Sequence, residues 1–157
     1  MRYDVDIASV PARPVVSLRR RGPLADIGAS MRRLRELITE AGLEPAGPMM
    51  ARFYTDTTPG ADADYDVAIA VVPPADGCVP DAVGEARGEW LPLHQVLEAV
   101  HHGPHGQMGD AWAAVREACA AAGCTPAGPV TEVYEVTRTD GVPPEQYVTR
   151  VQLPYVR

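Results

Sequence analysis

The sequence lacks the short motifs that identify common enzyme classes. It has no serine or cysteine in a nucleophile elbow, no Walker-type phosphate-binding loop and no dinucleotide-binding fingerprint. Its 3 cysteines are odd in number and follow no metal-ligand spacing, which indicates a reducing compartment. We therefore expect a cytoplasmic protein that holds no cofactor and no metal.

Long apolar runs and a surplus of basic residues are also missing. No stretch approaches the roughly 20 apolar residues that span a bilayer, and the first residues lead into an alternating segment with no signal-peptide pattern. The 157 residues carry 14 basic and 21 acidic side chains, which gives a net charge of -7. Because contact with phosphates needs a basic surface, we expect neither direct nucleic acid binding nor membrane association.

The chain does contain an internal repeat. An offset that places residue 41 on residue 122 aligns the chain with itself without a gap, so that positions 41–48 (AGLEPAGP) meet positions 122–129 (AGCTPAGP). Such a repeat arises when one structural unit is used twice, which predicts a pseudo-two-fold axis and a ligand cleft at the seam. Other aligned pairs are Gly22 and Gly103, Gly60 and Gly141, Val67 and Val148, and Pro73 and Pro154.

Hydrophobic periodicity predicts the order strand, helix, strand, strand in each half. The apolar residues of both helices recur at a 4-3-4-3 spacing, which is typical of one buried helix face. Gly42 and Gly123 stand where a left-handed helix cap is expected. The fold class is therefore α+β, a tandem βαββ repeat with helices on one side of each sheet and a ligand groove between the halves. The predicted elements are strand 15–20, helix 25–41, strands 49–55, 65–72 and 96–101, helix 107–122, and strands 130–137 and 146–153.

All of residues 1–157 are expected to form a single domain of two repeats, residues 1–73 and 89–157. Neither half is long enough to be expected to fold stably alone. Residues 74–88 are rich in proline, glycine and acidic side chains, and we interpret them as the linker. Polar loops at residues 56–64 and 138–145 separate the third and fourth elements of each half.

The third strands of the two halves differ in a way that points to chemistry. Glu132 aligns with Ala51, and Tyr134 aligns with Phe53. Residues two apart share a strand face, so Glu132 and Tyr134 are predicted to face the groove while Val133 faces the helix layer. A carboxylate beside an aromatic ring suits a flat organic cation, because the ring adds a cation–π attraction of about 0.5–2 kcal/mol. The alternative is an ordinary exposed strand with a surface glutamate.

Together these features resemble the GyrI-like small-molecule-binding domain, which is also the effector-binding domain of bacterial multidrug-sensing transcription activators. The resemblance covers nearly the whole chain and depends on the order of several weak motifs. They are the Gly-Pro turns before both helices, the Ala-Gly-Pro segments at 46–48 and 127–129, the triplet 132–134 and the ending 148–154. The resemblance implies paired βαββ modules with a shared groove, in which Glu132 faces the pocket and meets cationic, lipophilic compounds.

Pockets of this family are otherwise aromatic, and the resemblance suggests further ligand-binding residues on that basis. Tyr147 precedes the last strand and is placed to close over a ligand, and Met108 opens the second helix as a flexible apolar wall. For Trp112 and Phe53, burial in the core is the alternative. The full set of ligand-binding candidates is Glu132, Tyr134, Tyr147, Trp90, Phe53, Met108 and Trp112.

Two other clusters favour plain structural interpretations. His101, His102 and His105 suggest a metal site, but the Gly-Pro turn between them and the lack of a supporting cysteine favour a strand end and a solvated turn. The arginines at 19–21 and at 32, 33 and 35 are typical of a solvated strand end and helix face.

Two functions fit these residues. The first is binding, as a stand-alone multidrug-binding or sequestering module whose partner is a lipophilic cationic small molecule. The transcription activators carry a DNA-binding region ahead of this domain, and the first repeat here begins close to Met1. Direct gene regulation is therefore not expected without a protein partner, which the sequence does not identify. The alternative is a hydrolase of electrophilic cyclopropane-bearing natural products, in which Glu132 activates water and Tyr134 hydrogen-bonds the developing oxyanion.

Overall fold

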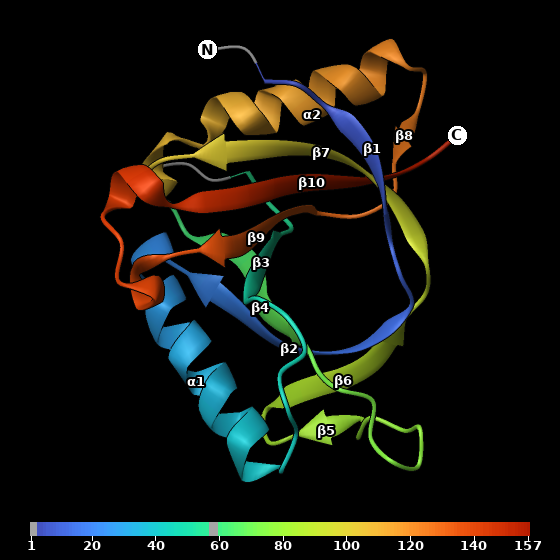
Figure 1. The fold of residues 1–157 in the computed structure, drawn as a ribbon, viewed down its shortest axis with the longest axis vertical. Helices are drawn as coiled ribbons and strands as arrows, with labels where there is room; N and C mark the ends of the chain where they lie inside the picture. Colours follow the sequence, from blue (N-terminus) through green and yellow to red (C-terminus); the bar gives the residue numbers. More distant parts are fainter. Residues whose placement is uncertain (1–2, 57–59) are drawn as a thin grey trace. The chain divides into compact units, whose positions relative to one another are not determined.

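The computed structural model describes residues 3–56 and 60–157 and divides into two compact units (Figure 1). The N-terminal unit is Pro11–Leu93, and the C-terminal unit combines the chain up to Val10 with His94–Arg157. Residues 1–2, at the start of the stretch without a signal-peptide pattern, lie outside the described residues. Residues 57–59, in the predicted polar loop 56–64, also lie outside them.

The N-terminal unit is an antiparallel sheet with one long helix. Its strands are hydrogen-bonded in the order β3-β4-β2-β6-β5. The helix α1 packs on β2 and β4 through Leu34, Leu37 and Ile38, which are buried. The elements are β2 (Arg13–Gly22), the 3-10 helix η1 (Leu24–Asp26), α1 (Ile27–Glu40), β3 (Met50–Phe53), β4 (Ala63–Ala70), β5 (Ala82–Val83) and β6 (Ala86–Leu91).

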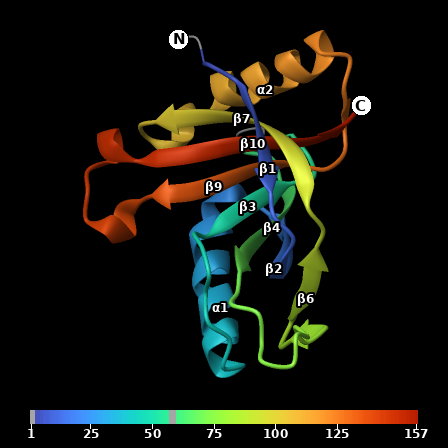
Figure 2. The same cartoon turned by 45° about the vertical axis from the view of Figure 1, so that its right-hand side comes forward.

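The C-terminal unit has the same construction. Its strands follow the order β1-β7-β10-β9, with β8 paired to the end of β10, and α2 packs on β7 and β10. Figure 2 shows α2 running alongside β7. The elements are β1 (Asp6–Val10), β7 (His94–His102), η2 (His105–Gln107), α2 (Gly109–Ala121), β8 (Thr125–Pro126), β9 (Val130–Val136), η3 (Arg138–Asp140), η4 (Pro144–Gln146) and β10 (Val148–Val156).

The α+β class is confirmed, and the strand order of one βαββ set matches that of the other. The third, fourth and first strands pair in that order in both units, as β3-β4-β2 and as β9-β10-β7. Both helices end at a glycine with a left-handed φ of 69°, Gly42 and Gly123, as the sequence predicts.

The gap-free alignment is wrong for the last strand. Ala51 pairs with Val67, and the repeat alignment places Glu132 on Ala51 and Val148 on Val67. Glu132 pairs instead with Val151, further along the chain than Val148. The first and fourth strands show the same displacement. Val15 pairs with Ala70, which the alignment places on Val151, but Val96, the equivalent of Val15, pairs with Pro154.

The connection between β9 and β10 is therefore longer than that between β3 and β4. The extra length equals the separation in sequence between Val148, the partner that the alignment predicts for Glu132, and Val151, its observed partner. The extra length lies in the region of η3 and η4. The alignment did not reveal this extra length, because prolines and glycines still matched across it. The strand predicted at 146–153 also extends further than expected, since β10 continues through Pro154 to Val156.

Two leading strands, which the sequence did not predict, extend the repeat. Asp6 of β1 pairs with Glu98 of β7. The repeat alignment places Asp6 on Arg87 of β6, and Arg87 pairs with Ser17 of β2. The leading strand of each repeat thus joins the sheet that contains the other repeat. The predicted linker 74–88 was wrong in part, since β5 and the start of β6 lie within it. Its glycine content suited a tight hairpin, in which Gly84 has a φ of 61°.

Candidate functional site

Glu132 lies on β9 with its carboxylate buried against α2. Only 8% of the residue is exposed. Trp112 of α2 donates its indole N–H to Oε2 at 2.7 Å, and the Tyr134 hydroxyl donates to Oε1 at 2.8 Å. The predicted facing of this strand was therefore wrong, because Glu132 faces the helix and Val133 faces the opposite side. Two hydrogen-bond donors make a carboxylate tolerable beneath a helix, which a hydrophobicity pattern cannot show.

The electrostatics of the site are those of an anion without a paired cation. Burial raises the pKa of Glu132, and the hydrogen bonds from Tyr134 and Trp112 and the nearby His101 oppose this in part. Burial and the adjacent Glu132 hold the pKa of Tyr134 well above its usual range, so this hydroxyl stays protonated as a donor. Among residues 3–56 and 60–157, no arginine or histidine forms an ion pair with Glu132.

An aromatic cluster adjoins the carboxylate. The imidazole of His105, on η2, has its ring centroid 5.1 Å from that of Tyr134 and 4.9 Å from that of Tyr147. Both tyrosines are buried, at 8% and 9% exposure. Met108 is buried at the start of α2, where its carbonyl accepts the backbone N–H of Trp112. The structure thus brings five of the seven predicted ligand-binding residues into one unit.

A second set of polar groups extends from the same sheet face. His101 is buried on β7, with Nδ1 2.7 Å from the Tyr3 hydroxyl and Nε2 3.0 Å from the Pro104 carbonyl. A carbonyl only accepts, so Nε2 of His101 donates to the Pro104 carbonyl. Thr149 pairs with both His101 and Tyr134 across neighbouring strands. Its Oγ1 is fully buried and has no hydrogen-bond partner among the described residues.

Equivalent positions in the N-terminal unit are apolar. The repeat alignment places Ala51, Phe53 and Met31 where the C-terminal unit has Glu132, Tyr134 and Trp112. Phe53 is buried, with its ring centroid 6.4 Å from that of Tyr65. Trp90 lies on β6 with 46% exposure and donates its indole N–H to the Gly77 carbonyl at 3.0 Å. The carboxylate and its two donors therefore occur in only one of the two repeats.

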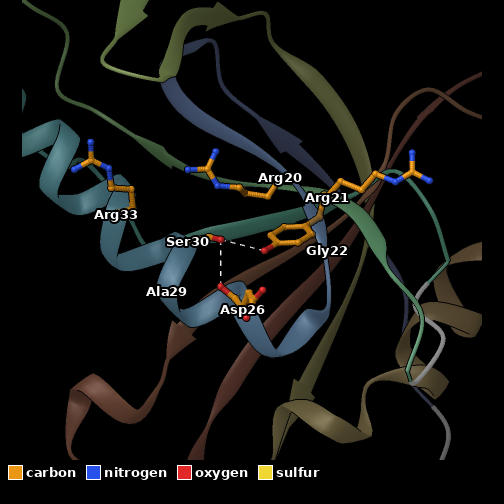
Figure 3. Close-up of a pocket in the computed structure, with 8 residues that line it drawn as sticks. Arg20, Arg21, Gly22, Asp26, Ala29, Ser30 and Arg33 are labelled. Atoms are coloured by element: carbon orange, nitrogen blue, oxygen red, sulfur yellow. Dashed lines mark hydrogen bonds between the residues drawn. The ribbon is translucent and has the colours of Figure 1, made fainter.

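The N-terminal unit carries a surface pocket of about 290 Å³, shown in Figure 3. Among its lining residues, the hydroxyls of Tyr65 and Ser30 lie 3.0 Å apart, and Ser30 also donates to the Asp26 carbonyl at 3.2 Å. Arg33 and Arg20 at its edge both pair with Glu85, so these groups largely satisfy one another. The lining residues are Arg20, Arg21, Gly22, Asp26, Ala29, Ser30, Arg33 and Tyr65.

Sequence reasoning missed several of these residues. The interpretation of His101 and His105 as a strand end and a solvated turn agrees with the structure, since His101 lies near the end of β7 and His105 is exposed on η2, but it did not include their contacts with Tyr3, Tyr134 and Tyr147. Thr149 was missed because only the strand register reveals its neighbours. The arginines of the pocket are distant in sequence from Tyr65 and Glu85, so the sequence pattern did not group them. No group of three or more metal-ligating side chains in the described part of the chain is arranged to hold a metal.

A profile of the GyrI-like small molecule binding domain matches residues 3–156. The chain belongs to this family. Curated proteins offered no significant match. Within the described part of this GyrI-like domain, no helix is both long and apolar enough to cross a membrane.

Solved structures show the same fold at low sequence identity. The C-terminal domain of EcmrR matches with a TM-score of 0.86 and 15% identity over 100% of this chain and 99% of that one. EcmrR in its DNA complex matches equally well, but there the chain spans only 58% of the EcmrR length. A hydrolase from Listeria innocua (TM-score 0.65, 13% identity, 97% and 91% covered) has the same fold. So does SAV2435 bound to tetraphenylphosphonium (0.63, 13%, 99% and 94%). Since EcmrR was solved on DNA, the fold does not exclude a protein that binds nucleic acid.

Proposed function

We propose that this GyrI-like domain binds a lipophilic organic cation, with Glu132 as the countercharge. The observation that carries the proposal is a buried carboxylate whose described partners are two neutral donors. Removing an anion from water is unfavourable unless a cation or several hydrogen bonds compensate for it. Trp112 and Tyr134 compensate in part, and a bound cation would complete the charge balance.

The neighbouring side chains suit the apolar part of such a ligand. Tyr134, Tyr147 and Trp112 offer aromatic rings, which attract cations through their faces, and Met108 offers an adaptable apolar surface. The orphaned Oγ1 of Thr149 adds a polar atom without a partner among the described residues. The proposal also agrees with the ligand of SAV2435, tetraphenylphosphonium, which is a lipophilic cation.

Hydrolysis is a second candidate, favoured by one contact. The Tyr134 hydroxyl lies 2.8 Å from Oε1 of Glu132, which joins a candidate general base to a hydrogen-bond donor for an oxyanion. A hydrolase also occurs among proteins of the same fold. The substrate class would be an electrophilic cyclopropane-bearing compound, to which Glu132 would direct water. Mass analysis of that compound after incubation separates turnover from binding, and turnover should fall about 100-fold or more in Glu132→Gln.

The binding proposal is tested by titration calorimetry with tetraphenylphosphonium at neutral pH. Glu132→Gln keeps the shape and removes the charge, so it should weaken binding by about 1–3 kcal/mol, or roughly 5- to 150-fold. Glu135→Gln is the matched control, because Glu135 lies on the same strand, is exposed and pairs instead with Arg150. It should leave the affinity unchanged.

A neutral probe that keeps three of the four phenyl rings, triphenylphosphine oxide, completes this test. Its affinity should be nearly the same for the wild-type protein and for Glu132→Gln, since it carries no charge to pair. Equal affinity of both proteins for tetraphenylphosphonium would remove Glu132 from the binding site. Failure of the wild-type protein and every variant to bind the cation would overturn the proposed function.

A further inference from the structure

We propose that His105 is a built-in occupant of the ligand site, which an incoming cation has to displace. This inference rests on the proposed function. The surface that His105 occupies is made by the rings of Tyr134 and Tyr147, and we call it the aromatic seat. The imidazole lies against both rings, at centroid distances of 5.1 and 4.9 Å. At such separations rings are in direct contact, so no second ring fits between them.

The aromatic seat is joined to the countercharge. Tyr134 contributes its ring to the seat and its hydroxyl to Oε1 of Glu132. A cation whose aryl ring lies on the tyrosine rings beside the carboxylate must therefore take the place of the imidazole. The N-terminal unit has Leu24 at the position equivalent to His105, and Ala51 at that of Glu132. The histidine and the carboxylate thus occur in the same repeat.

His105 is held in a way that permits its displacement. Its two ring nitrogens have no hydrogen-bond partner among the described residues, so ring contacts alone retain it. It belongs to a single 3-10 turn, His105–Gln107. Gly106 follows it in open space, and Gly103 precedes it with a φ of 125°. By contrast, Tyr134 and Tyr147 are buried.

Its charge state makes His105 a weak occupant. The His105 side chain is exposed, but the two tyrosine rings partly desolvate it and so lower its pKa; the nearby His101 adds to this effect, which favours the neutral imidazole at neutral pH. A neutral ring gains little from the carboxylate beneath the seat, whereas a permanent organic cation gains from both the charge and the rings. Ligands with a fixed positive charge should therefore displace His105 more readily than neutral ligands of the same shape.

The test measures tetraphenylphosphonium affinity by calorimetry for the wild-type protein, His105→Ala and His105→Phe. Emptying the seat with His105→Ala should tighten binding about 2- to 10-fold, the size of one aromatic contact. His105→Phe keeps a ring in the seat and should not tighten binding. His102→Ala is the matched control, because His102 is exposed on the strand just before the turn. Unchanged or weaker binding by His105→Ala would show that the imidazole is part of the ligand's wall, and would overturn the proposal.

A second measurement avoids any variant. In the wild-type protein, the imidazole NMR signals of His105 should move when tetraphenylphosphonium is added, because the ring leaves the tyrosine faces. Binding without such a change would overturn the displacement. Binding by His105→Ala but not by the wild-type protein would support it strongly. Absence of binding in all proteins would instead contradict the proposed function itself.

Discussion

Glu132 connects the stability of this protein to pH. Burial raises its pKa in the folded protein above the ordinary value of 4.5. A carboxyl group of this kind contributes stability that is fully present below its unfolded pKa and is lost as the pH rises through the folded pKa. Raising the pKa of a group by one pH unit in the folded protein corresponds to about 1.4 kcal/mol of this stability. The ionised form needed for binding a cation is thus the form that the empty fold tolerates least.

Substitution of this residue should reveal that cost. The free energy of unfolding of Glu132→Gln, relative to the wild-type protein, should rise as the pH is raised above 4.5 and level off once the pH exceeds the folded pKa of Glu132, because Gln has no charge to desolvate. Urea unfolding across this pH range measures the difference. Glu135→Gln, on the exposed face of the same strand, should show a difference that varies little with pH. A flat difference for Glu132→Gln would show that its carboxylate is not penalised by burial.

At the scale of elements, each helix is tied to its sheet by a different polar contact. In the C-terminal unit Trp112 of α2 reaches Glu132 of β9. In the N-terminal unit Ser30 of α1 meets Tyr65 of β4, and both residues are buried. The second contact has no charged member, so its worth should be that of an ordinary buried hydrogen bond.

A double-mutant cycle tests that value. Tyr65→Phe and Ser30→Ala should each lower the free energy of unfolding by about 1 kcal/mol, because each leaves a buried hydroxyl with one partner fewer. The double variant should lose clearly less than the sum, since the two changes remove the same hydrogen bond. Additive losses would mean that the 3.0 Å contact contributes nothing to stability.

Periodicity predicted the elements well but not their faces or register. The helices predicted at 25–41 and 107–122 are α1 and α2 with a 3-10 turn before each, because apolar spacing does not distinguish the two helix types. On β9, residues Val130 to Tyr134 are all buried, so alternation gave no sign of which face meets the helix. The face of Glu132 depends on a donor from α2, which lies far from it in the sequence.

The two units share the strand order of third, fourth and first strand, and the buried carboxylate whose described partners are two neutral donors, Glu132, lies in the C-terminal unit. The first three elements of each repeat keep a single offset, while the fourth strand of the second repeat is displaced further along the chain. The insertion lies between β9 and β10, next to Tyr147, which belongs to the aromatic seat. Self-alignment showed the internal repeat, and the difference between Glu132 with Tyr134 and the aligned Ala51 with Phe53 pointed to the candidate site. It did not show His105 or Thr149, which three-dimensional neighbours alone identify.

In the proposed function, Glu132 is the countercharge of a bound cation. A cation favours the ionised carboxylate, so binding should release protons at pH values just above 4.5, where the raised pKa leaves part of Glu132 protonated. Calorimetry with tetraphenylphosphonium in buffers of different ionisation enthalpy measures this release. The difference between the wild-type protein and Glu132→Gln reports on Glu132, because His105 contributes to both. We expect net release from the wild-type protein and its loss in Glu132→Gln, whereas equal proton release by the two proteins would show that Glu132 is not the countercharge.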